Sequence, residues 1–396
     1  MIQRVLDGLV VLELGQVYNV PYCALLLAHL GADVIKIEPP LGEPARHRAA
    51  GAESAPFLML NAGKQGMRLD LKTSAGRAVF LRLVATCDVV VENYRAGTHD
   101  NLGLDYAALR AFNPAVILAR GRGFSPKGPY GPLAAMDLTV QAMTGVLATT
   151  GFPDQPPVKA GPAVADFLGG IHLFAGILAA LLQRQQTRQG QVVEVAMQDA
   201  LLPSLASNLG ALIDSHGELP ERTGNRHSGL GICPYNTYLA KDGWVAVFCS
   251  TNRHWLVLCR VLDRPDLRDD PTLQDNAGRS ARMDEIDAIV GDWTKSRSRG
   301  QILEALGHAG IPAAPVLTLK EVMADPQIEA SGMFQTVRHP RKGDVRVFGN
   351  PLHLSSSPPR QLEPAPALGE HTRTVLRERL HMTEAEIDQL AADGAI

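Results

Sequence analysis

Asp166 is a carboxylate whose surroundings in the sequence suggest chemistry. It follows a loop rich in proline and glycine at residues 151–162 and stands at the start of a long stretch with helical spacing, residues 167–186. The first turn of a helix offers unpaired N–H groups and a partial positive charge, which would keep this carboxylate ionised and could bind an oxyanion. The same position suits a helix N-cap, and spacing alone favours that structural role.

Motifs for the common catalytic and nucleotide-binding sites are missing. The sequence has no G-x-x-x-x-G-K-[ST], no H-E-x-x-H, no Cys/His set with zinc spacing and no G-x-S-x-G. Gly121 and Gly123 follow an expected strand, but the third glycine and the following helix of a dinucleotide-binding fingerprint are absent. We therefore expect an α/β protein with no metal site and no common nucleotide signature.

Short apolar strands alternate with helices along the first 125 residues. Strands are expected at residues 10–14, 33–38, 88–92 and 115–119, and helices at residues 21–30, 74–87 and 105–112. Strands this apolar, separated by helices, predict a parallel sheet that is covered on both faces. Ligands of such a sheet bind beyond the carboxyl ends of its strands.

The pattern breaks at residues 215–234, which predicts a domain boundary. Helices are expected before it at residues 136–146 and 199–214, and beyond it strands at 243–249 and 316–319, several helices, and a charged helix at 370–380. The predicted division is a large domain over residues 1–214, a small domain over 222–320 and a C-terminal segment over 330–396.

Composition excludes several classes of protein. The chain has 396 residues, 45% of them hydrophobic and 20% charged, which is ordinary globular composition for two or three domains. The net charge of −3 gives no overall field for a polyanion, so we expect no nucleic-acid partner. Five cysteines without a C-x-x-C pair predict free thiols in a reducing compartment. The apolar run at 171–182 is shorter than the about 20 residues that span a bilayer, so we expect a soluble cytoplasmic protein.

A series of sequence blocks resembles one known family. The blocks lie at residues 6–14, 26–39 (LLAHLGADVIKIEP), 64–73, 88–95 (DVVVENYR), 102–105, 222–226, 234–235, 242–244 and 310–313. In order and spacing they resemble the family III CoA-transferases of the CaiB/BaiF type, which include formyl-CoA transferase and carnitine CoA-transferase. The resemblance implies a Rossmann-like large domain completed by the C-terminal tail, a smaller inserted α/β domain, and subunits that close into rings and interlock as a homodimer.

The resemblance gives Asp166 a chemical role. In this family an aspartate attacks the thioester of an acyl-CoA, and the matching position here is Asp166. The implied chemistry is covalent, through an aspartyl anhydride and an aspartyl-CoA thioester, and it needs no metal. Family members carry a glycine-rich loop over the active site, and the matching stretch here includes Ser228, Gly229 and Gly231. It is less rich in glycine than in formyl-CoA transferase, so a closing lid and an ordinary interdomain turn both stay open.

The resemblance also implies contacts to coenzyme A. Loops after the first and third expected strands should line the pantetheine and the thioester, a leucine should contact the adenine, and a lysine and an arginine should approach phosphates. The residues implied are Gln16, Val17, Tyr18, Asn19, Arg46, Leu69, Lys72, Asn93 and Tyr94. Formyl-CoA transferase has arginines where this chain has Pro39 and Asn101, so the alternatives for the phosphate contacts are Lys36, Arg68 and Arg95.

Two alternatives to a transferase remain. The same fold hosts α-methylacyl-CoA racemases, which pair the aspartate with a histidine in a G-H-D segment, but the segment here is Ala135-Met136-Asp137. Two-base proton exchange therefore lacks one partner, and we favour a transferase. A non-catalytic CoA-binding paralogue is the other alternative.

The acceptor acid is the least determined part of the prediction. Polar Gln16, Tyr18 and Asn19 with Arg46 nearby would suit a small dicarboxylate, such as succinate, malate, mesaconate or itaconate, with succinyl-CoA as donor.

Overall fold

The computed structural model describes residues 4–49, 53–358 and 360–396, which form two compact units. The first unit comprises the chain up to Gln141, Pro162–Leu201 and Pro326–Ile396, and the second comprises Ala142–Gly161 and Leu202–Asp325. This differs from the predicted division, because residues 142–161 and 202–214 cluster with the second unit. They contribute no strand to the sheet that organises the first unit.

A six-stranded sheet organises the first unit, with the order β3-β2-β1-β4-β5-β6 and every pairing parallel. Its strands are β1 (Val10–Leu14), β2 (Asp33–Glu38), β3 (Gln65–Arg68), β4 (Val89–Glu92), β5 (Ile117–Arg122) and β6 (Val192–Ala196). The predicted parallel sheet is confirmed, although the four-residue β3 was missed because its sequence, QGMR, has no apolar run. The strand order reverses between β1 and β4, which opens a crevice at their carboxyl ends.

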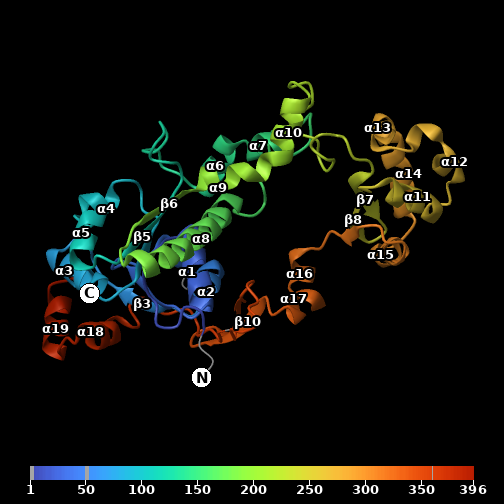
Figure 1. Ribbon diagram of the computed structural model, residues 1–396. Helices are drawn as coiled ribbons and strands as arrows, with labels where there is room; N and C mark the ends of the chain where they lie inside the picture. Colours follow the sequence, from blue (N-terminus) through green and yellow to red (C-terminus); the bar gives the residue numbers. More distant parts are fainter. Residues whose placement is uncertain (1–3, 50–52, 359) are drawn as a thin grey trace. The chain divides into compact units, whose positions relative to one another are not determined.

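Helices cover both faces of this sheet. Helices α1 (Asn19–His29) and α8 (Val164–Thr187) pack with one set of strand side chains into a buried apolar cluster. On the other face, α3 (Ser74–Val84) and α5 (Tyr106–Phe112) share a cluster with the C-terminal α18 (Thr372–Leu380) and α19 (Glu384–Ala392). Figure 1 shows these last two helices, in red, beside α3, so the tail does return to the large unit.

Helix α8 is long, with 24 residues, and largely apolar. By length and composition it is the one helix among the described residues that could cross a membrane, but half of its most apolar part is buried inside the protein. It packs on α1, β5 and β6. Burial against the sheet therefore accounts for its apolar face.

The second unit has an antiparallel sheet of order β7-β8-β9 and a core that includes Trp255 and Leu258. Two predictions here were wrong. The expected strand at 316–319 lies beyond β9, because Thr318 and Glu321 form a capping box that starts a helix. The expected helix at 199–214 is interrupted by a 3₁₀ turn that contains Pro203.

The other elements complete the fold. In the first unit they are η1 (Pro44–His47), α2 (Ala55–Asn61), α4 (Thr98–Asn101), α9 (Met197–Leu201), α17 (Pro326–Ala330), β10 (Phe334–His339) and β11 (Gly343–Phe348). Helix α6 (Asp137–Thr144) runs from the first unit into the second. In the second unit they are α7 (Val146–Thr149), η2 (Leu202–Leu205), α10 (Ala206–Asp214), β7 (Tyr235–Ala240), β8 (Gly243–Phe248), α11 (Asn252–Val261), α12 (Pro265–Asp269), η3 (Pro271–Leu273), α13 (Asn276–Ala281), α14 (Met283–Lys295), α15 (Arg299–His308), β9 (Ala313–Pro315) and α16 (Leu319–Val322).

Candidate active site

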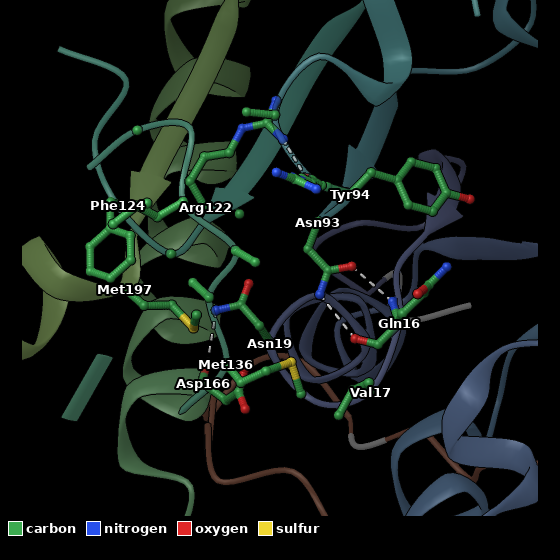
Figure 2. A pocket seen from close by; sticks show the side chains of 18 residues that line it. Gln16, Val17, Asn19, Asn93, Tyr94, Arg122, Phe124, Met136, Asp166 and Met197 are labelled. Atoms are coloured by element: carbon green, nitrogen blue, oxygen red, sulfur yellow. Dashed lines mark hydrogen bonds between the residues drawn. The ribbon is translucent and has the colours of Figure 1, made fainter. Parts of the chain in front are cut away.

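A cavity of about 200 Å³ lies at the carboxyl ends of β1, β4 and β5, where the strand order reverses. Residues from the loops after these three strands line it together with Asp166 of α8 (Figure 2). The lining residues are Gln16, Val17, Asn19, Asn93, Tyr94, Arg95, Ala96, Gly121, Arg122, Gly123, Phe124, Gly131, Leu133, Ala134, Ala135, Met136, Asp166 and Met197. This is the position that a parallel sheet gives to its ligand.

Asn93 fixes the loop that follows β1. Its Oδ1 accepts the N–H of Gln16 at 2.9 Å, and its Nδ2 donates to the carbonyl of Gln16 at 2.9 Å, as the two dashed lines in Figure 2 show. Arg122 acts similarly on the next loop, since its Nη1 donates to the carbonyl of Tyr94 at 2.6 Å and its Nη2 pairs with Glu92 at 3.0 Å. The amide of Asn93 is therefore committed to the loop backbone in this structure.

Asp166 is the third residue of α8, which begins at Val164. The residue is only 8% exposed. Its backbone carbonyl accepts Nδ2 of Asn19 at 3.0 Å, but within the described residues its carboxylate oxygens accept no hydrogen bond. The carboxylate is thus buried at a cavity wall and free of the contacts that would occupy its lone pairs.

Asp137, rather than Asp166, caps the start of α8. Its Oδ1 accepts the N–H of Ala165 at 2.8 Å and the N–H of Asp166 at 3.3 Å. Asp137 belongs to α6, so this cap comes from another element. The structural role that spacing favoured for Asp166, a helix N-cap, is therefore wrong, because Ala163 holds the N-cap position and Asp137 supplies the acceptor.

The pKa of Asp166 is raised to about 7. Burial is the largest cause, the nearby charge of Asp137 also raises the pKa, and the charge of Arg48 lowers it. We expected the helix start to keep this carboxylate ionised. That expectation was wrong in degree, because the loss of solvation outweighs the helix dipole, whose contribution at an N-terminus is typically about 0.3–1 kcal/mol. Near neutral pH the group is therefore divided between its neutral and nucleophilic forms.

Of the ten residues predicted for catalysis and coenzyme A, six line the cavity and four, namely Tyr18, Arg46, Leu69 and Lys72, do not. Those at the cavity are Gln16, Val17, Asn19, Asn93, Tyr94 and Asp166. Leu69 is 1% exposed and belongs to the sheet core, so its side chain offers no surface to an adenine ring. Lys72 is exposed beyond the end of β3, where its ammonium group is accessible.

Arg46, the predicted phosphate or carboxylate contact, is paired with Glu38 in this structure. Its Nη2 and Nε bind the two oxygens of Glu38 at 2.6 and 3.0 Å, and the side chain is 4% exposed. Lys36, an alternative for the phosphate contacts, is fully buried. Of the remaining alternatives, Arg68 and Arg95 are both exposed, and only Arg95 lines the cavity.

Arg48 is a cation near Asp166 that sequence reasoning did not single out. It lies over the ring of Tyr18 with its guanidinium carbon 5.1 Å from the ring centre, and its Nη1 donates to the Tyr18 hydroxyl at 2.7 Å. The Tyr18 ring stacks on Phe167, the residue after Asp166, with the ring centres 6.1 Å apart. No motif marks Arg48, because its approach to Asp166 depends on how the β2–α2 connection folds back.

Ser228, Gly229 and Gly231 lie in the second unit. Ser228 lines a separate cavity of about 160 Å³ together with Leu209 and Leu212 of α10. The lid role therefore stays a prediction. Among the described residues, no group of three or more His, Cys, Asp and Glu side chains is arranged to hold a metal ion.

Comparison with known proteins gives a consistent result. The family model described as CoA-transferase family III matches residues 6–372. A succinyl-CoA–D-citramalate CoA-transferase of Chloroflexus aurantiacus is 34% identical over 399 residues, which cover 99% of this chain and 98% of the relative. A succinyl-CoA:mesaconate CoA-transferase of Haloarcula hispanica is 36% identical, covering 94% and 96%, and a formyl-CoA:oxalate CoA-transferase of Streptomyces avermitilis is 34% identical, covering 99% and 100%.

The solved structures agree with this similarity. A CaiB/BaiF family protein from Brucella suis superposes with a TM-score of 0.85 and 34% identity, over 95% of this chain and all of that one.

Proposed function

Because the chain belongs to CoA-transferase family III, we propose that it moves coenzyme A from succinyl-CoA to a small dicarboxylic acid through covalent intermediates on Asp166. CoA-transferase activity follows from the family, and the substrates and the aspartyl mechanism are our proposal. The observation that carries the mechanism is the buried carboxylate of Asp166, which is free of hydrogen bonds within the described residues and stands at the cavity where β1 and β4 end.

The first half-reaction forms an aspartyl thioester. A carboxylate oxygen of Asp166 attacks the thioester carbonyl, the C–S bond breaks, and the products are a mixed anhydride and CoA thiolate. The thiolate then attacks the aspartyl carbonyl of the anhydride, which expels the donor acid as its carboxylate. The second half-reaction reverses these two steps with the acceptor acid and regenerates Asp166.

Water must be excluded while these intermediates exist, since anhydrides and thioesters hydrolyse. The low exposure of Asp166 and the small cavity serve this purpose. The N–H groups at the start of α8 are held by Asp137. Oxyanion stabilisation therefore depends on other donors at the cavity, among which Nδ2 of Asn19 already binds the carbonyl of Asp166.

Arg48 supports a dicarboxylate acceptor. The guanidinium is exposed, fixed on Tyr18, and close enough to Asp166 for its charge to act on that carboxylate. An acid that presents one carboxylate to Asp166 can place a second one against Arg48. The relatives described above are named for citramalate, mesaconate and oxalate, all of which carry two carboxylates. Itaconate, malate and succinate fit the same chemistry.

Coenzyme A would follow the loops at the carboxyl ends of the strands. Gln16, Val17 and Asn19 would line the thioester end, and Asn93 and Tyr94 would shape the wall from the β4 side. The exposed cations Lys72 and Arg95 are available for phosphates. The lining residue Met136, where a racemase has histidine, lacks a proton-transfer group, which argues against a racemase. We also propose the interlocked homodimer and the cytoplasmic location that the resemblance implies.

The replacement Asp166→Asn tests the nucleophile. We expect exchange of CoA between succinyl-CoA and mesaconate or itaconate to fall by at least roughly a thousandfold, because the amide cannot form the anhydride. Binding of CoA, measured by calorimetry, should change by less than about threefold. In the wild type, mass spectrometry of quenched and digested enzyme should find acyl or CoA mass on the peptide that contains Asp166. Retained exchange in the variant would refute the assignment, and CoA binding without any exchange by the wild type would favour a non-catalytic paralogue.

Stability provides the folding control for this variant. Since the pKa of Asp166 is raised, the folded state binds more protons than the unfolded state between pH 4 and about 7, and stability is lost as pH rises through that range. Asn does not titrate, so the variant should be more stable than the wild type at pH 8, by roughly 2–4 kcal/mol, and should lose this advantage near pH 4.

Arg48→Gln tests the acceptor. A charge-assisted hydrogen bond of about 1.5–3 kcal/mol predicts a rise of roughly tenfold to hundredfold in KM for a dicarboxylate acceptor. The KM for a monocarboxylate such as butyrate should stay within a factor of about two. His47→Gln is the matched control, because the neighbouring imidazole binds the Leu41 carbonyl instead. An equal effect of Arg48→Gln on both acceptors would contradict the assignment.

A further inference from the structure

Four fully buried charges lie beneath the loop that connects β1 to α1. Glu13 and Lys36 come from β1 and β2, Glu43 precedes η1, and Lys64 precedes β3. Their side chains are at most 1% exposed. Nζ of Lys36 pairs with Glu13 and Glu43, both at 3.2 Å, and Nζ of Lys64 pairs with Glu13 at 2.8 Å. We refer to these four residues as the buried charge cluster.

The buried charge cluster binds the backbone of the β1–α1 loop and of the first turn of α1, which contains Pro21. Nζ of Lys36 donates to the carbonyl of Gly15 at 2.9 Å, and Nζ of Lys64 donates to the carbonyl of Pro21 at 2.9 Å. Oε2 of Glu43 accepts the N–H of Val17 at 2.9 Å. Together with Asn93, which holds both backbone groups of Gln16, these contacts hold Gly15, Gln16 and Val17 in place, and the last two of these residues line the cavity.

Val17 needs such support. Its φ of 65° lies in the left-handed region, which is unfavourable for a β-branched residue. Strained backbone of this kind persists only where the surroundings fix it, and it gathers at functional sites. Val17 lines the cavity in Figure 2, beside the wall formed by Gln16.

The presence of buried ion pairs is not explained by a gain in stability, since the loss of hydration offsets the attraction between the charges. Their contacts with the loop give these charges a different purpose. We propose that the buried charge cluster holds the β1–α1 loop in the conformation that receives the thioester, with Glu43 as the positioning residue that keeps Val17 in its left-handed conformation. The consequence for turnover rests on the proposed function, whereas the coupling between Glu43 and Val17 does not.

Glu43→Gln tests the proposal with little change in size. Oε1 of Glu43 faces Nζ of Lys36, and Oε2 faces the N–H groups of Val17 and Ala45. In either orientation of the glutamine amide, its NH₂ group faces another hydrogen-bond donor. The variant must therefore lose either the contact with Lys36 or the hydrogen bonds from Val17 and Ala45. We expect kcat/KM for the acyl-CoA donor to fall at least tenfold, and wild-type kinetics in this variant would overturn the proposal.

Val17→Gly separates positioning from general stability. Glycine adopts the left-handed conformation without strain, so it needs Glu43 less than valine does. We expect Glu43→Gln to cost at least threefold less kcat/KM in the Val17→Gly background than in the wild type. The loss of unfolding free energy in urea should shrink in the same way. Equal losses in both backgrounds, by both measurements, would overturn the proposal.

Asp88→Asn is the matched control. Oδ2 of Asp88 accepts the N–H of Val10 at 2.8 Å at the other end of β1, and Oδ1 pairs with Arg184 at 2.8 Å. This variant should lower stability and leave kcat/KM unchanged. A tenfold loss of kcat/KM would show that weakening any contact to β1 lowers activity, and it would overturn the role of the cluster. If the wild type transfers no CoA, the proposed function fails, and the urea measurements still decide whether Glu43 holds Val17.

Discussion

At the scale of single residues, the reactivity of the site depends on two opposing influences on one carboxylate. The start of α8 favours the charged form of Asp166, whereas burial and the nearby carboxylate of Asp137 favour the neutral form. Burial dominates, and the pKa lies near 7. A carboxylate that is poorly solvated when ionised is a stronger nucleophile than one in water, so the same burial that costs stability favours attack on a thioester.

The pH dependence of activity should report this balance. We expect kcat/KM for the acyl-CoA donor to rise with pH through an apparent pKa near 7, because only ionised Asp166 attacks. Asp137→Asn removes the neighbouring negative charge and keeps an acceptor oxygen for the N–H groups of α8, so it should move this limb to lower pH. Rate measurements from pH 5 to 9 with one donor and one acceptor test the shift.

Asp105→Asn is the matched control for this profile. Asp105 caps α5 through the N–H of Ala108, at 2.8 Å, and is not among the cavity residues. It should leave the profile in place. A profile that is unmoved by Asp137→Asn would mean that Asp137 acts on α8 only as a cap.

At the scale of elements, the site depends on how closely α1 approaches α8. Gly169 and Gly170 of α8 allow this contact, because a Cβ atom would lie 2.4 Å from Nδ2 of Asn19 at the first position and 2.6 Å from the Asn19 carbonyl at the second. A Cβ atom on Gly121, near the end of β5, would lie 2.3 Å from Oδ1 of Asn19 and clash with it. Asn19 is thus enclosed by glycines, and its hydrogen bond to the Asp166 carbonyl depends on them.

Gly170→Ala should separate these helices. The added methyl meets backbone rather than a flexible side chain, so we expect a loss of about 1–3 kcal/mol in unfolding free energy. Exchange activity should fall as well, since Asp166 lies four residues earlier on α8. Gly307→Ala is the control, because Gly307 in α15 has open space around it and alanine should stabilise that helix by up to about 1 kcal/mol. Equal stability of the two variants, measured by urea unfolding, would contradict this account.

At the scale of the whole molecule, two compact units have separate apolar cores. All three tryptophans, Trp244, Trp255 and Trp293, belong to the second unit. Trp255 is fully buried in its core. Intrinsic fluorescence therefore observes the unfolding of the second unit, whereas far-ultraviolet circular dichroism observes both.

Core substitutions should separate the two signals. Leu258→Ala in α11 should lower the midpoint of the fluorescence transition, since removing a buried leucine side chain costs about 2–5 kcal/mol. Leu27→Ala in α1, which is equally buried, should shift the dichroism transition and leave the fluorescence midpoint in place. Coincident shifts of both signals in both variants would show that the two units unfold as one.

Sequence by itself determined the parallel sheet and the position of Asp166 at the start of a helix. These features depend on periodicity and on the order of strands, which are local properties of the chain. Five cysteines without paired spacing likewise predicted free thiols, and all five are unpaired and also buried.

Tertiary structure decided which charges are available and in which state. Arg46 and Arg48 are two residues apart, yet only Arg48 is accessible, because Glu38 from a neighbouring strand binds Arg46. Contacts between distant segments set the pKa of Asp166 and bring Glu43 to the backbone of Val17. They also make Asp137, and not Asp166, the cap of α8. Solvation and pairing are set by the complete packing around a group, and no local pattern in the sequence encodes that packing.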